Sequence, residues 1–333
     1  MAPLAISLGD PAGIGPELIA EAWERRKTEG LPPFFVSGGA RVLSEAAQRR
    51  GLDVPVIAID HPAEAADAFA QGLPVLGGHD GEYRPGEPDE QGANLAIASL
   101  HHATQLTVSE AASAIVTGPI AKSHLARFGF TQPGQTEFVA DHSGTLRDDA
   151  VMMLAGPSLR TVPLTVHTAL AAVPGLLSID LITRRVRVVA AALARDHGLP
   201  RARIAITGLN PHAGEDGRMG DEEQRIIAPA IARLQAEGLA VTGPHPADAL
   251  FAAHERSGYD VAVCMYHDQA LIPIKTLDFD QGVNVTLGLP IVRTSPDHGT
   301  AFGIAGTGRA SAGATVAAIR MAGQCAARRA AAR

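Results

Sequence analysis

Short apolar runs alternate with longer amphipathic stretches along the whole chain. The apolar runs predict buried strands at Leu4–Leu8, Phe34–Ser37, Val54–Ile59, Ala114–Thr117, Val151–Leu154, Val162–Val166, Ile204–Thr207 and Val261–Met265, with further strands possible at Val283–Leu287 and Val292–Arg293. Apolar residues at helical spacing predict helices over Glu17–Thr28, Asn94–Val108, Ile179–His197, Glu222–Glu237 and Ala314–Ala332. Strands that alternate with helices in this way predict an α/β fold with largely parallel sheets.

The chain length sets the domain organisation. At 333 residues, the chain is long enough for two domains of ordinary size or for one large α/β unit. No obvious linker divides it once, so we expect a domain that the chain leaves and later re-enters. We place the first domain at residues 1–130 together with 270–333, and the second at residues 131–269.

Composition and charge exclude several classes of protein. Hydrophobic residues make up 46% of the chain and charged residues 19%, so a packed core is expected. The net charge of −7, without a basic block to offset it, argues against a nucleic acid or an anionic membrane as partner. Cys264 and Cys325 are too few for a disulfide framework. With no long apolar run and no basic leader, we expect a cytoplasmic protein.

Three histidines directly follow predicted strands. His167, His212 and His267 each lie where a strand gives way to a polar turn. Because the carboxyl ends of parallel strands line the ligand crevice of an open α/β sheet, these imidazoles could together hold one divalent metal ion. The alternative is that they are ordinary, hydrogen-bonded loop histidines.

A second group of residues is suited to binding an anion. Lys275, Asn284 and Arg293 lie close together in the sequence, and an arginine can grip a carboxylate or phosphate through two parallel hydrogen bonds. Gln135 and Thr136 lie in a polar turn that opens a helix, where the helix N-terminus could hold an anion. The alternatives are solvated surface charge for the basic residues and simple helix capping by Thr136.

Two glycine-rich segments could approach a cofactor. GDPAGIGPE, from Gly9, follows a strand and opens a helix, but its spacing is not that of a dinucleotide fingerprint, and Pro11 and Pro16 remove amide donors. It is either a structural turn with Pro16 in the first helical turn or a direct phosphate contact. The later segment, with Asp297, His298 and Gly299, is either a plain turn or a loop that lets a ligand reach the backbone.

Taken together, the motifs resemble the 4-hydroxythreonine-4-phosphate dehydrogenases of vitamin B6 biosynthesis. The matching stretches are GDPAGIGPE from Gly9, TGPIAK from Thr117, GQTEF from Gly134, GLNPHAGEDGRMGDEE from Gly208, GPHPADALF from Gly243, YHDQALIPIK from Tyr266 and GVNVTLGLPIVRTSPDHGTA from Gly282. They span nearly the whole chain in order. GDPAGIGPE and HGTAFGIAG are also similar to motifs of isocitrate and isopropylmalate dehydrogenases, which implies their two-domain fold with the active site in the cleft between domains.

The resemblance implies roles for individual residues. His167, His212 and His267 match the family's ligands to a divalent metal, which is zinc, magnesium or cobalt. The substrate contacts of the family match Gln135, Thr136, Lys275, Asn284 and Arg293, with Lys275 a candidate for proton transfer. Gln135 stands where the family usually has histidine, so it can donate a hydrogen bond to a phosphate but carries no positive charge. Asp297, His298 and Gly299 resemble the loop that holds the adenosine end of NAD.

The resemblance also implies a reaction and an assembly. NAD or NADP would oxidise 4-phosphonooxy-L-threonine at C3, and the resulting 3-oxo acid would lose carbon dioxide to give 3-amino-2-oxopropyl phosphate. The family works as a homodimer whose metal ligands meet at the subunit interface. Relatives oxidise other diols, namely phosphorylated four-carbon sugar acids (phospho-threonate or erythronate) and the cis-dihydrodiol of terephthalate, and Gln135 favours that alternative. A non-catalytic protein that binds small anions is a further alternative.

Overall fold

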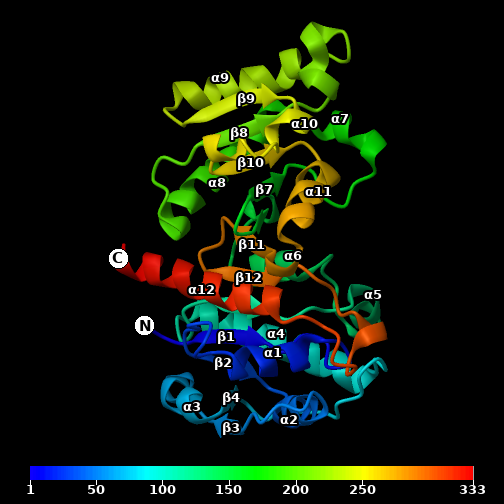
Figure 1. The fold of residues 1–333 in the computed structure, drawn as a ribbon, viewed down its shortest axis with the longest axis vertical. Helices are drawn as coiled ribbons and strands as arrows, with labels where there is room; N and C mark the ends of the chain where they lie inside the picture. Colours follow the sequence, from blue (N-terminus) through cyan, green and yellow to red (C-terminus); the bar gives the residue numbers. More distant parts are fainter. Residues whose placement is uncertain (333) are drawn as a thin grey trace. The chain divides into compact units, whose positions relative to one another are not determined.

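The computed structural model describes residues 1–332 and divides the chain into two compact units. The first consists of residues 1–147 together with 289–331, and the second of residues 148–288. The first unit therefore contains both the blue start of the chain and the red helix near its end in Figure 1. Residues 131–147 lie in the first unit and residues 270–288 in the second, so the limits differ from those placed at 130 and 270 from the sequence.

The first unit is built on parallel strands. Their order is β3 (Val56–Ile59), β4 (Leu73–Leu76), β2 (Phe34–Ser37), β1 (Leu4–Ser7), β5 (Ile115–Thr117) and β12 (Arg293–Pro296), and each neighbouring pair is parallel. The helices of this unit are α1 (Gly15–Glu24), α2 (Ala40–Arg49), α3 (Ala65–Gln71), α4 (Glu90–Val108), α5 (Lys122–Leu125), α6 (Gln135–His142) and α12 (Gly313–Ala331).

Packing against helices explains the apolar sequence of these strands. The helix α4 contacts β1, β2 and β5, and α12 contacts β12, β5 and β1. All residues of β1, β2 and β4 are buried, as expected for parallel strands covered by helices. The sequence analysis did not predict β4, because Pro74 interrupts an otherwise apolar run and proline is depleted in strands.

The second unit has a mixed arrangement of strands. Their order is β11 (Val283–Leu287), β6 (Val151–Ala155), β7 (Arg160–Pro163), β10 (Val261–Cys264), β8 (Ile204–Thr207) and β9 (Val241–His245). The strand β6 is antiparallel to both β11 and β7, and the remaining pairs are parallel. The helices are α7 (Val173–Leu176), α8 (Ile179–His197), α9 (Ala228–Ala236), α10 (Ala247–Leu250) and α11 (His267–Asp278). The predicted α/β fold with mostly parallel strands is confirmed.

Local signals account for the limits of the longest helix in this unit. The Ser178 hydroxyl caps the start of α8 by accepting a hydrogen bond from the Leu181 amide at 3.1 Å. Gly198, in the left-handed region at φ 69°, ends it. Within the described part of the chain, no helix is long and apolar enough to cross a membrane.

Candidate active site

A buried arginine is the centre of a polar cluster in the first unit. Arg293 begins β12 and pairs in parallel with Ile115, the first residue of β5, and its side chain extends to Thr117 at the carboxyl end of β5. Its Nη2 donates to Thr117 Oγ1 at 2.7 Å and to Gln135 Oε1 at 3.2 Å. Its Nε also donates to Thr117 Oγ1, at 3.2 Å, and its Nη1 donates to Thr136 Oγ1 at 3.3 Å. The structure therefore brings Gln135, Thr136 and Arg293 together, as predicted residues of one anion site.

Burial dominates the electrostatics of this cluster. Only 3% of Arg293 is exposed, and burial lowers the pKa of its guanidinium to about 10, against the opposing effect of the Glu137 charge. The side chain is therefore still a cation at neutral pH, and the loss of water around its charge destabilises the folded protein. A bound anion would offset that cost through charge-assisted hydrogen bonds, which is the chemistry of a carboxylate or phosphate site.

The start of α6 adds to the positive potential beside Arg293. Gly134 is the N-cap residue of the helix and has no side chain with which to cap it. A Cβ on Gly134 would lie 3.0 Å from Glu137 Oε2 and 3.1 Å from Lys122 Nζ, so the ends of these two side chains occupy the space left by the missing side chain. A helix N-terminus and an ammonium group both favour anions. Lys122 was missed from the sequence, although it ends the TGPIAK motif.

Two of the three predicted metal ligands lie near each other in the second unit. His167 follows β7 with a left-handed φ of 51°, and His267 is the first residue of α11. The centroids of their rings are 6.2 Å apart. The His267 Nδ1 is paired with Asp268 Oδ1 at 2.7 Å, the kind of contact that orients a metal-binding imidazole.

The third histidine lies on a strained loop of the same unit. Residues 212–216 all have φ between 41° and 80°, a region that non-glycine residues rarely adopt. The buried Glu223 carboxylate holds this loop by accepting hydrogen bonds from the Leu209 and Asn210 amides, both at 2.8 Å, and from Asn210 Nδ2 at 3.0 Å. Sequence reasoning missed Glu223, which ends the GDEE run. Among residues 1–332, no group of three or more His, Cys, Asp or Glu side chains is arranged to hold a metal.

Lys275 and Asn284 also belong to the second unit. Lys275 is half-buried on α11, two helical turns after His267. Asn284 pairs with Leu154 across β11 and β6, and its buried Oδ1 has no hydrogen-bond partner among residues 1–332. Because a buried acceptor is costly when it stays unsatisfied, Asn284 is suited to a ligand with a hydrogen-bond donor.

The two glycine-rich segments pack against each other in the first unit. The Ile14 amide donates to the Thr300 carbonyl at 2.9 Å, and a Cβ on Gly13 would lie 2.8 Å from that same oxygen. Close backbone packing thus explains a glycine of the GDPAGIGPE motif. In the later segment, His298 Nδ1 lies 3.1 Å from the Gly299 carbonyl, and both residues are only partly buried or exposed, next to Asp297.

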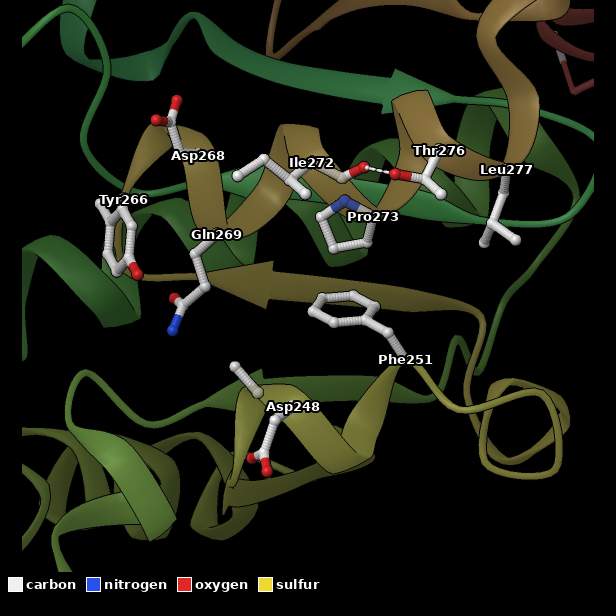
Figure 2. A pocket seen from close by; sticks show the side chains of 10 residues that line it. Asp248, Phe251, Tyr266, Asp268, Gln269, Ile272, Pro273, Thr276 and Leu277 are labelled. Atoms are coloured by element: carbon white, nitrogen blue, oxygen red, sulfur yellow. Dashed lines mark hydrogen bonds between the residues drawn. The ribbon is translucent and has the colours of Figure 1, made fainter.

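A groove beside α11 is lined by none of the predicted site residues, although Tyr266 and Asp268, the neighbours of His267, do line it. It has a volume of about 470 Å³, and Figure 2 shows Phe251 opposite Pro273 and Ile272. Ile272 is 62% exposed, and Phe279, just after the helix, is 70% exposed.

Comparison with solved structures indicates a dehydrogenase. A 4-hydroxythreonine-4-phosphate dehydrogenase from Klebsiella pneumoniae superimposes with a TM-score of 0.85 at 39% identity over 98% of both chains. A terephthalate 1,2-cis-dihydrodiol dehydrogenase from Burkholderia xenovorans LB400 follows at a TM-score of 0.66 and 27% identity, over 97% of this chain and 98% of that one.

Sequence comparison narrows the class to one family. The model of the pyridoxal phosphate biosynthetic protein PdxA matches residues 30–322. A 4-hydroxythreonine-4-phosphate dehydrogenase from Erythrobacter litoralis is 64% identical over 98% of each chain. The chain therefore belongs to the PdxA family of 4-hydroxythreonine-4-phosphate dehydrogenases, oxidoreductases of vitamin B6 biosynthesis, and the predicted family is confirmed.

Proposed function

We propose that this chain oxidises 4-phosphonooxy-L-threonine at C3 with NAD or NADP, giving a 3-oxo acid that loses carbon dioxide to form 3-amino-2-oxopropyl phosphate. The observation that carries the proposal is the buried guanidinium of Arg293 beside Thr136, Lys122 and the start of α6. The substrate has a phosphate and a carboxylate, and a phosphate ester alone carries a charge of about −1.5 to −2 at neutral pH. This cluster suits one of those groups.

The other predicted contacts complete the proposal. Arg293 and Thr136 bind an anionic group of the substrate, and Lys122 adds charge at the same place. In the second unit, Asn284 offers its buried Oδ1 to a donor, and Lys275 binds the substrate and takes or gives a proton. The loop with Asp297, His298 and Gly299 holds the adenosine end of the cofactor.

The histidines are suited to a divalent metal ion. Imidazole is a ligand for zinc, cobalt and related ions, and the Asp268 contact holds the His267 ring in one orientation. His167, His212 and His267 would hold the ion. When bound, the metal supplies Lewis acidity toward the C3 hydroxyl and toward the negative charge that develops during loss of carbon dioxide.

A homodimer is part of the same proposal. The three histidines do not gather into one group within the described chain, so a complete site needs ligands from a second copy. The exposed Ile272 and Phe279 are the kind of apolar surface that a second copy would cover.

The test is NAD(P)H production from 4-phosphonooxy-L-threonine, measured by absorbance with and without EDTA. Phospho-threonate and the cis-dihydrodiol of terephthalate serve as competing substrates. We expect fast turnover of the amino acid that EDTA abolishes and that added metal restores. Turnover of another diol alone would overturn the substrate assignment. The dihydrodiol is the second candidate because the Burkholderia enzyme of that name shares the fold at 27% identity, and because Gln135 removes a charge from the anion site.

A further inference from the structure

We propose that Gln135 is a positioning residue that orients Arg293 and does not itself contact the substrate. The inference rests on the proposed function, in which Arg293 binds an anionic group. It concerns the one motif position at which this chain departs from the usual histidine, and it assigns Gln135 a role different from that of a direct phosphate ligand.

Both ends of the Gln135 amide are already bonded to protein. Its Nε2 donates to the Gly118 carbonyl at 2.8 Å, and its Oε1 accepts from Arg293 Nη2 at 3.2 Å. The residue is 8% exposed. Turning the amide over would place its NH₂ against the guanidinium and its oxygen against a carbonyl, so only one orientation satisfies both partners. These two bonds leave one N–H and one lone pair of the amide, but its position and orientation are set by the Gly118 carbonyl and the Arg293 guanidinium.

The carbonyl that anchors Gln135 is itself fixed. The Gly118 amide donates to the Ser7 carbonyl at 3.0 Å, and a Cβ on Gly118 would lie 2.6 Å from the Leu8 carbonyl oxygen. Gly118 thus packs directly on the backbone that follows β1. A rigid backbone segment holds Gln135, and Gln135 with Thr117 holds one edge of the Arg293 guanidinium.

This arrangement matters because an arginine binds an anion through the orientation of its planar fork. An unrestrained side chain of this length would lose rotamer freedom when the anion binds, and preorganisation avoids that loss. Glutamine also performs the task without a change of charge. A histidine can donate to Gly118 and accept from Arg293 only while it is neutral, because a protonated imidazole has two donors and no acceptor. The charged groups around this position are Arg293, Glu137 and Lys122.

The sign of a pH effect in Gln135→His distinguishes the two roles. We would measure Kd for inorganic sulfate, whose charge is constant from about pH 5 to 9, and KM for the phosphorylated substrate, each as a ratio to wild type. If Gln135 positions Arg293, the ratio rises as pH falls through the histidine range near 6.5, because the protonated ring repels the guanidinium. If the residue at this position contacts the anion directly, the ratio falls, because a positive charge is added.

Three further variants complete the experiment. Gln135→Leu should weaken sulfate binding by about ten- to a hundredfold, the value of a hydrogen bond to a charged group, with kcat changed less than KM. Gln135→His at high pH should recover most of that loss. Gln132→Leu, in the preceding turn, is the matched control and should bind as wild type does. Because Gln135→Leu could also disturb folding, Gln135→Asn serves as a second variant. The asparagine side chain is too short to contact both the Gly118 carbonyl and Arg293, so Gln135→Asn should also bind sulfate weakly.

Failure of this inference is distinguishable from failure of the proposed function. The positioning role would be overturned if the Kd ratio of Gln135→His to wild type falls as pH falls, or if Gln135→Leu binds sulfate as wild type does. Neither result would affect the proposed function. Wild-type protein that binds sulfate through Arg293 but does not oxidise the phosphorylated amino acid would overturn the proposed function and leave the positioning role supported by the Kd values. Wild-type protein that binds no anion would overturn both.

Discussion

Replacement of Arg293 by methionine should weaken anion binding more than it changes the free energy of unfolding. Burial lowers the pKa of this guanidinium from its ordinary value to about 10. At about 1.4 kcal/mol for each tenfold change in proton affinity, holding the charge in the protein costs about 3 kcal/mol. This destabilisation is fully present at every pH below the pKa of Arg293 in the folded protein. It decreases only as pH rises through about 10, because Arg293 then loses its proton in the folded protein before it does so in the unfolded chain. Between about pH 6 and 9 it is constant.

The hydrogen bonds of Arg293 act in the opposite direction. The side chain donates to Thr117, Gln135 and Thr136, and loss of each bond costs about 1 kcal/mol. The two effects nearly cancel, so Arg293→Met should change the free energy of unfolding by no more than about 2 kcal/mol. Loss of one charge-assisted hydrogen bond to the anion should instead cost about 1.5 to 3 kcal/mol, which raises KM or Kd by about 10- to 100-fold.

Urea denaturation at fixed pH gives the first quantity, and sulfate titration with substrate kinetics gives the second. Arg185→Met is the matched control: burial also lowers the pKa of Arg185, whose Nη1 donates to the Leu164 carbonyl in the second unit, and its loss should leave anion binding unchanged. Binding by Arg293→Met within about threefold of wild type would refute the anion site. A loss of more than about 4 kcal/mol of stability would instead show that Arg293 is mainly structural.

Three further predictions concern residues that the sequence did not single out for these roles. Lys122→Met should raise KM about three- to tenfold at unchanged kcat, as expected for one exposed charge near a bound anion; the exposed Lys27→Met should have no effect in the same assay. Glu223→Gln should lower the free energy of unfolding by about 1–3 kcal/mol and metal affinity by about 10- to 100-fold in a chelator competition, because the loop of His212 loses its support; unchanged metal affinity would contradict that role. Burial raises the pKa of Asp10, so its negative charge destabilises the folded protein above that pKa. Asp10→Asn should therefore have a higher free energy of unfolding than wild type at about pH 8, and the difference should shrink as pH falls. A difference that stays the same as pH is lowered from about 8 would contradict this.

The secondary structure was predictable where one local signal dominated. The strand β8 and the helix α8 have the limits that their apolar patterns predict. A short apolar run between turns and a long pattern with a period of about 3.6 residues are each compatible with few other secondary structures. The predictions failed where prolines or glycines break the pattern. The strand β9 contains Gly243 and Pro244, and α11 contains Pro273, whose place in a helix depends on packing against β7 and β10.

The candidate site was predictable only as a set of residue types. The sequence places Gln135 and Arg293 more than 150 positions apart, and their hydrogen bond exists because β12 pairs with β5 beside the start of α6. A motif shows that a glutamine replaces a histidine, but whether that side chain faces a ligand depends on which acceptors surround it. In this chain the Gly118 carbonyl and the buried guanidinium take both ends of the amide. A change of residue in a binding motif can therefore leave the ligand the same and alter only how the neighbouring charge is held.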